Sequence, residues 1–120
     1  MAEVEVEEHF RKVSALEPTL VESHYQLGYI LHNYKHQIKE AEACYREVLR
    51  LEPDCFSALY SLANLLECYK HNLPAAEIFY RRAVGVDPDN HDAQFYFANV
   101  CSNIIYNPYI HTVHASVLLT

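Results

Sequence analysis

The feature that most constrains this chain is a repeat of 35 residues. Pro18, Pro53 and Pro88 lie 35 residues apart, and each follows an acidic residue. The same shift superposes longer segments, namely 34–36 on 69–71, 41–42 on 76–77 and 45–46 on 80–81. A period of roughly 20 to 50 residues indicates a solenoid or another repeat architecture, in which each unit packs against its neighbours.

Each period contains two helical patterns. In the first, Leu27, Leu31 and Tyr34 are spaced by four and three residues, which places them on one face of a helix. In the second, an apolar stripe alternates with charged residues, and its members are Ala41, Tyr45, Val48 and Leu51. The patterns predict helices at about 3–16, 20–34, 38–51, 55–70, 74–86 and 90–105.

The ends of these helices follow from local chemistry. The repeated proline cannot donate a backbone hydrogen bond, so the preceding helix is expected to end before it. The residue after each proline (Thr19, Asp54 or Asp89) is expected to cap the next helix. Pro74 suits the first turn of its helix. Two i,i+4 ion pairs are expected on the exposed side of the second helices, Glu42–Arg46 and Glu77–Arg81.

The two-helix unit resembles the tetratricopeptide repeat over roughly residues 3–105. A small residue recurs where paired helices would touch, as Gly28, Ala63 and Ala98. In each second helix an alanine precedes a tyrosine by four residues, as in Ala41–Tyr45 and Ala76–Tyr80, and a proline closes the unit. The resemblance implies an all-α fold, a right-handed solenoid of helix–turn–helix units. Two full repeats would be flanked by two half repeats, giving about six helices.

Some residues depart from the usual pattern. The period is 35 residues, where about 34 is customary, and the extra residue falls in the turn between paired helices. There 35–37 (Lys-His-Gln) and 70–72 (Lys-His-Asn) replace the customary glycine. A related family, the half-a-tetratricopeptide repeat of RNA-processing assemblies, has a second helix similar to residues 76–83. Membership in an RNA-processing complex is therefore an alternative, without direct contact to RNA.

The C-terminal end differs in composition from the rest of the chain. From Ala93 to Thr120 there is no Asp, Glu, Lys or Arg. We assign residues 1–107 to the helical repeat array and 108–120 to an uncharged tail. Three interpretations of the tail remain open: a disordered end, a short helix covering the last repeat, or a product that ends early in unrelated residues. Each leaves an apolar end that invites self-association.

Composition narrows the functional classes. The net charge of −7 disfavours nucleic acid as a ligand, and no stretch is long and apolar enough for a membrane span. The acidic N-terminus does not resemble a signal peptide, and the four cysteines include no CxxC pair. These observations favour an intracellular protein, cytoplasmic or nuclear and not secreted, with reduced thiols.

The resemblance also implies where a partner would bind, because the first helix of each tetratricopeptide pair lines a concave groove. Tyr25, Tyr60 and Phe95 form an aromatic row in that groove, one period apart. A second row consists of Tyr29, Asn64 and Asn99, with Glu22, Ser57 and Asp92 alongside. Aromatic faces give large contact areas, and asparagine amides can hold an extended backbone. The alternative is that the aromatic side chains pack between repeats and the asparagines are solvated.

Several sharper functions are not expected. Chaperone-binding relatives hold a C-terminal carboxylate with lysine, arginine and asparagine, but the matching positions are Tyr25, Tyr29, Ser61, Asp92 and Tyr96. These offer no cation, so binding of a chaperone tail is not expected. The pairs His32/His36 and His111/His114 have spacings that suggest metal ligands, yet His36 and His71 occupy equivalent turns, as a repeat feature would. No catalytic arrangement emerges, so we expect no enzyme, no metal and no cofactor.

The sequence therefore predicts a non-catalytic scaffold or adaptor that binds a peptide or helix of another protein in its groove. The alternative from a different class is a structural fragment of a larger repeat array, whose unfinished ends join end to end. A scaffold predicts a monomer, whereas end-to-end assembly predicts a mass that grows with concentration.

Overall fold

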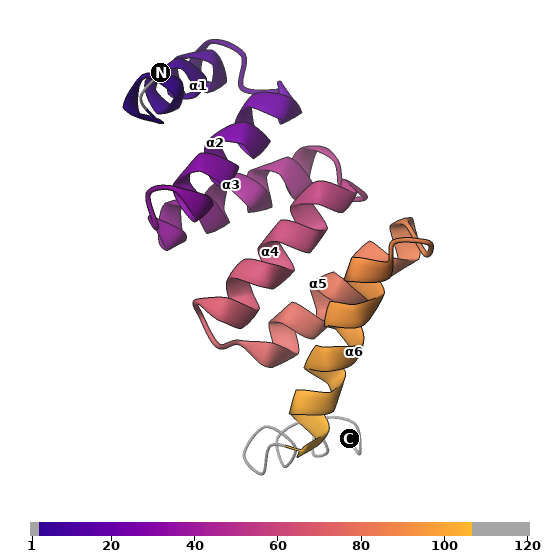
Figure 1. The fold of residues 1–120 in the computed structure, drawn as a ribbon. Helices are drawn as coiled ribbons and strands as arrows, with labels where there is room; N and C mark the ends of the chain where they lie inside the picture. The colour runs from indigo at the N-terminus through magenta and orange to yellow at the C-terminus, as the bar shows by residue number, and fades with distance from the viewer. Residues whose placement is uncertain (1–2, 107–120) are drawn as a thin grey trace.

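The computed structural model describes residues 3–106, which form six helices (Figure 1). The helices are α1 (Glu3–Leu16), α2 (Val21–Asn33), α3 (Ile38–Leu51), α4 (Phe56–Cys68), α5 (Leu73–Val86) and α6 (His91–Tyr106). Each begins and ends within two residues of the expected bounds. No strand occurs in residues 3–106, so the predicted all-α fold is confirmed. The tail at 108–120 lies outside the described residues.

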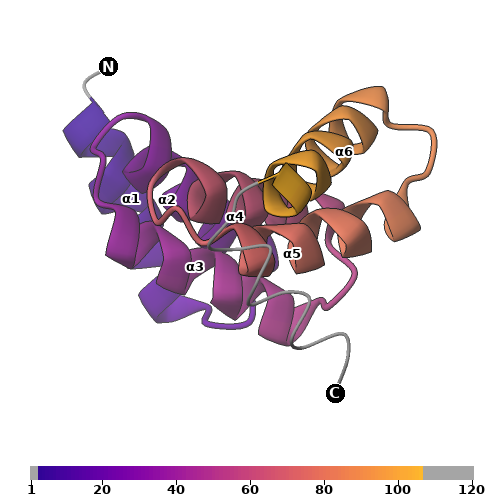
Figure 2. The ribbon, with the colours of Figure 1, turned by 90° about the horizontal axis from the view of Figure 1, so that it is seen from below.

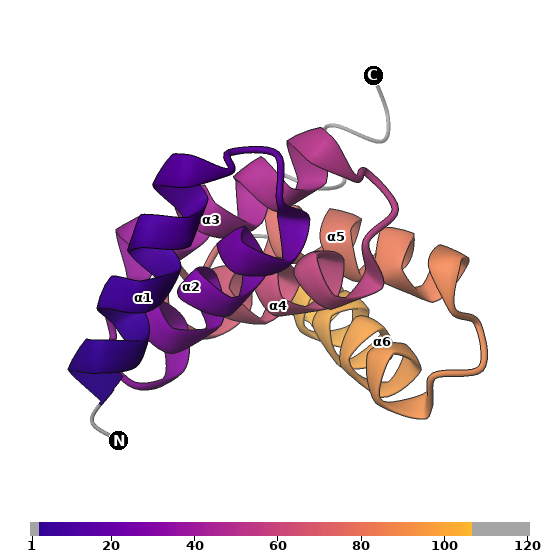
Figure 3. The same ribbon diagram turned by 90° about the horizontal axis from the view of Figure 1, so that it is seen from above.

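Consecutive helices pack against each other along the chain and form two layers. In Figures 2 and 3, α2, α4 and α6 lie on one side, and α3 and α5 lie on the other. α2 also contacts α4 directly. The resulting array is elongated, with principal extents of 47 × 27 × 25 Å. Within residues 3–106, no helix has the length and apolarity needed to cross a membrane.

The core repeats along with the sequence. Tyr45 and Tyr80, one period apart, are fully buried, and each hydroxyl bonds the residue thirteen positions before it. The Tyr45 hydroxyl lies 3.1 Å from Nδ1 of His32, and the Tyr80 hydroxyl donates to Oε1 of Glu67 at 3.0 Å. A buried hydroxyl without a hydrogen-bond partner destabilises the fold, so each repeat needs a partner for its buried tyrosine. Leu27 and Leu62 are also buried, as the helical pattern predicts.

The turns between paired helices contain a left-handed residue. His36 and His71 have φ angles of 53° and 51°, in the region that glycine adopts most easily. The residue after each histidine closes the turn: the N–H of Gln37 donates to the Leu31 carbonyl at 2.9 Å, as does that of Asn72 to Leu66. Histidine stands here in place of the customary glycine, and it adopts the left-handed conformation that the turn requires.

The predicted caps at Thr19, Asp54 and Asp89 were wrong. These residues lie inside a proline turn that the backbone closes itself, with N–H to carbonyl distances of 3.0, 3.1 and 3.2 Å for residues 20 to 17, 55 to 52 and 90 to 87. The N-cap residues of α2 and α4 are therefore Leu20 and Cys55, and neither makes a side-chain capping hydrogen bond. Asn90 caps α6 by accepting from the Ala93 N–H. Pro74 lies in the first turn of α5, as predicted.

Two further expectations need correction. The Glu42–Arg46 and Glu77–Arg81 pairs both form, but Glu77 is not on an exposed side, because it is only 6% exposed. Cys101 and Ile104 of α6, with Arg81, line the same small pocket as Glu77. Ala98, in contrast, is exposed. Within residues 3–106 no second helix follows α6, so Ala98 has no paired helix to touch.

Candidate functional site

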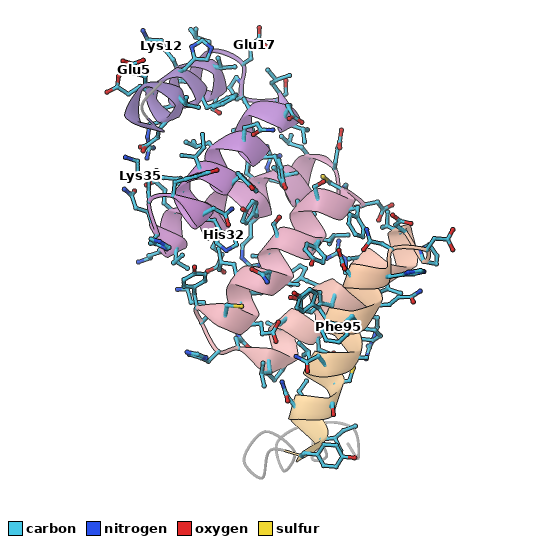
Figure 4. All side chains as sticks on the ribbon, in the orientation of Figure 1. Glu5, Lys12, Glu17, His32, Lys35 and Phe95 are labelled. Atoms are coloured by element: carbon cyan, nitrogen blue, oxygen red, sulfur yellow. The ribbon has the colours of Figure 1, made fainter. Side chains whose placement is uncertain are left out.

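The six predicted groove residues all lie on α2, α4 and α6, the helices of one layer. They differ in exposure. Tyr25, Tyr60 and Asn64 are half-buried, whereas Tyr29 is 41% exposed and Phe95 65% exposed. Asn99 is also exposed. In Figure 4, Phe95 lies on α6 on the side that faces the viewer.

The half-buried members connect neighbouring repeats. The Tyr25 hydroxyl lies 3.4 Å from Oγ of Ser61, which links α2 to α4. Tyr60 of α4 makes edge contacts with Tyr80 and Tyr96, at ring-centroid distances of 6.0 and 6.1 Å. Burial is the main cause that raises the pKa of Tyr60. These side chains therefore hold the layer together, while Tyr29, Phe95 and Asn99 remain available to a ligand.

Tyr96 adds a further aromatic ring to the surface formed by the two predicted rows of groove residues. Its ring stacks on Tyr80 with an interplanar angle of 15° and a centroid distance of 6.2 Å. It also meets Phe95 edge-on at 5.3 Å. Tyr96 follows Phe95 directly, so the 35-residue period offered no separate signal for it. The equivalent positions hold Gln26 and Ser61, which are not aromatic.

A pocket of about 530 Å³ opens at one end of this surface. It lies between the start of α2 and the turn that leads from α3 into α4, and Glu22, Tyr25, Glu52, Cys55 and Ser57 are among its lining residues. Glu22, Tyr25 and Ser57 belong to the predicted rows. Glu52 and Cys55 were missed, because they come from the turn between repeats, which the helical pattern treats only as a boundary.

No three His, Cys, Asp or Glu side chains gather as a metal site within 3–106, and His111 and His114 lie outside that range. His32 is 5% exposed, against the rings of Tyr45 and Tyr69. Burial raises the pKa of the Cys44 thiol to about 11, and it also raises the pKa of Cys68 and Cys101. These thiols are held in the protonated form, which is a poor nucleophile.

Comparison with known families agrees with the geometry. Residues 21–55, which span α2, α3 and the turn before α4, match the family model described as tetratricopeptide repeat. The chain contains a tetratricopeptide repeat. Its fold is also similar to the crystal structure of MamA, with a TM-score of 0.74 and 19% identity over 82% of this chain. The match spans 56% of the MamA chain. No curated protein matches the chain at a significant level.

Tetratricopeptide-repeat proteins generally bind other proteins, and their fold is typical of non-catalytic scaffolds. In general terms the chain thus has the architecture of a protein-interaction scaffold. The match to the ordinary tetratricopeptide model covers one of the two full repeats, 21–55.

Proposed function

We propose that this tetratricopeptide-repeat protein is a scaffold that binds a peptide or helix of a partner protein on the surface of α2, α4 and α6. The observation that carries the proposal is the exposure of large aromatic side chains on this layer, Phe95 at 65% and Tyr29 at 41%. Aromatic side chains dominate the energetics of protein interfaces. Asn99 adds an exposed amide one helical turn after Phe95.

The same surface argues against recognition of a chaperone tail. α2, α4 and α6 contain no Lys or Arg, the side chains that hold a terminal carboxylate through charge-assisted hydrogen bonds in chaperone-binding relatives. We further propose that the scaffold works in the cytoplasm or nucleus, where its cysteines, all free thiols, would stay reduced.

The test is affinity capture from a cell extract with wild type, a groove variant and a matched control. Tyr29→Ala/Phe95→Ala/Asn99→Ala removes exposed groove side chains without touching the half-buried residues that join the repeats. Leu16→Ala/Ile78→Ala removes exposed apolar side chains of α1 and α5, away from the groove.

The expected result is a partner that wild type and control retain equally and the groove variant loses. Each interface aromatic contributes about 2 kcal/mol, so the groove variant should lose more than tenfold in affinity. Partners that all three proteins capture equally would rule out the groove. Circular dichroism of the three proteins shows whether each is folded.

A further inference from the structure

Charge is segregated between the two layers of the array. Every Lys and Arg of the described residues lies on α1, α3 or α5 or in the turns at 35 and 70, and α2, α4 and α6 contain none. The first helices nevertheless carry three carboxylates: Glu22, Glu67 and Asp92. Within residues 3–106 none of these three belongs to an ion pair, whereas the second helices pair Glu7, Glu40, Glu42, Glu47 and Glu77 with cations.

These three carboxylates lie near aromatic residues, and two of them accept hydrogen bonds from neutral groups: Glu22 from Gln26 at 2.7 Å and Glu67 from Tyr80 at 3.0 Å. Glu22 lines the open pocket together with Tyr25. Asp92 and Glu67 are close enough to the Tyr60 phenol to raise its pKa further, after burial and the neighbouring Tyr96. A carboxylate beside an aromatic face is a favourable place for an ammonium or guanidinium group, because the ion pair and the cation–π attraction add.

The pocket offers a second carboxylate. Glu52 lines it as Glu22 does, and both are exposed residues outside the ion pairs found within residues 3–106. With about 530 Å³, the pocket has room for a lysine or arginine side chain. Tyr25 at its wall supplies an aromatic face.

Helix ends at the pocket could favour either charge. The starts of α2 and α4 lie at its rim, and each contributes about +0.5 elementary charge. Glu52 is the C-cap residue of α3, and that helix end contributes about −0.5 elementary charge. The two carboxylates add two full negative charges, and the Arg82 guanidinium, which donates to the Pro53 carbonyl next to Glu52, adds one positive charge. The sum is about −0.5 and still favours a cation.

From this we infer that the segment bound on the α2–α4–α6 surface is cationic, and that one of its lysine or arginine side chains is held in the pocket between Glu22 and Glu52. The inference rests on the proposed function, because it names the chemistry of the partner for the same surface. Two cations of the chain itself come close to Glu52 and already have partners: Arg82 of α5 donates to the Pro53 carbonyl at 2.9 Å, and Arg50 pairs with Glu47 at 2.5 Å.

Three fluorescent peptides of equal length test the charge preference. They repeat Lys-Ala-Leu-Ala, Gln-Ala-Leu-Ala and Glu-Ala-Leu-Ala, and their binding to the full chain is followed by fluorescence anisotropy at low and high salt. The pocket variant is Glu22→Gln/Glu52→Gln. The matched control is Glu5→Gln/Glu8→Gln, which removes the same charge from exposed positions on α1, far from Phe95 in Figure 4.

We expect the lysine peptide to bind wild type about tenfold more tightly than the glutamine peptide, with affinity that falls as salt rises. The pocket variant should lose most of that preference and the control should keep it. Absence of lysine-peptide binding, or an equal loss in the control, would overturn the inference, since the latter means attraction to net charge alone.

Different outcomes separate a failure of the proposed groove from a failure of the cation preference. If the glutamine peptide binds as tightly as the lysine peptide, and both lose affinity with Tyr29→Ala/Phe95→Ala, the groove stands and the cation preference is wrong. If binding of every peptide is unaffected by Tyr29→Ala/Phe95→Ala, the groove itself is wrong.

Discussion

At the scale of single residues, the two full repeats use different side chains as the hydrogen-bond partner of an equivalent buried tyrosine. The hydroxyl of the buried tyrosine in the second helix needs a partner on the first helix, and His32 supplies it in one repeat and Glu67 in the next. Glu67 is half-buried, whereas His32 is 5% exposed. The histidine makes the stability of the first repeat depend on pH.

Burial, followed by the charge of nearby His36, lowers the pKa of His32. The folded chain therefore binds the proton less readily than the unfolded chain, in which the pKa is about 6.5. Stability from this residue is complete above that value and is lost as pH falls from about 6.5 towards the lower folded pKa. His32→Gln keeps an acceptor for Tyr45 and cannot titrate in this range.

We expect wild type to lose more free energy of unfolding than His32→Gln between about pH 7 and about pH 5. Urea denaturation across that range measures the difference. The other histidines are present in both proteins, so parallel curves would show that His32 does not respond to pH as its burial requires.

The left-handed turn residues give a second prediction at this scale. His71 has a φ of 51° and is exposed, so glycine there should relieve backbone strain and raise the free energy of unfolding by about 0.5–1 kcal/mol. His36→Gly should gain less, because the His36 ring also contacts Tyr69 at a centroid distance of 6.3 Å. Thermal denaturation of both variants ranks them. A loss of stability on His71→Gly would contradict the strain argument.

At the scale of helices, the close approach of paired helices is measurable at Gly28. A Cβ added there would lie 3.0 Å from Cβ of Cys44 and 3.0 Å from a ring carbon of Tyr45. Gly85 on α5 has nothing within 4 Å of the same atom. One substitution at the two sites thus separates helix propensity from packing.

Gly85→Ala should stabilise the protein by about 0.5 kcal/mol, since alanine is the better helix former. Gly28→Ala gains the same propensity but crowds a buried ring, so we expect a net loss of about 1 kcal/mol. Chemical denaturation of the two variants provides the comparison. Stabilisation of similar size at both sites would mean that α2 and α3 separate easily.

Helices and core were readable from the sequence, because the 35-residue period repeats the positions that pack, such as Leu27 and Leu62. The helix caps could not be predicted from the sequence, because backbone hydrogen bonds within each proline turn replace the expected side-chain caps. Glu77 lines a pocket together with Cys101 and Ile104 of α6, and the helical periodicity of α5 alone does not report such a neighbour. Four of the pocket's lining residues, Thr19, Leu20, Glu52 and Cys55, lie in the turns between repeats, and they come together because the repeats stack.

At the scale of the whole molecule, the two ends of the described array are unlike. The outer surface of α1 presents Glu5, Glu8, His9 and Lys12 around a shallow pocket. α6 instead exposes large apolar side chains, with Phe95, Ile105 and Tyr106 at 65%, 53% and 82%. Figure 4 places Glu5 and Lys12 at the opposite end of the molecule from Phe95. A repeat array typically has one polar cap at each end, and only the α1 end fits that description.

This asymmetry favours a closed dimer through the α6 ends over open end-to-end growth. Growth from end to end requires the α1 end to complement the α6 end, and a charged surface does not complement an apolar one. Contact between two α6 ends is apolar on both sides and closes as a dimer. We therefore expect the mass from sedimentation to level off no higher than a dimer as concentration rises. Ile105→Lys should weaken any dimer, and Leu16→Lys, at another exposed apolar residue (78%), should leave it unchanged. A mass that keeps growing, or equal sensitivity to both substitutions, would favour an open array in which unfinished repeats complete one another.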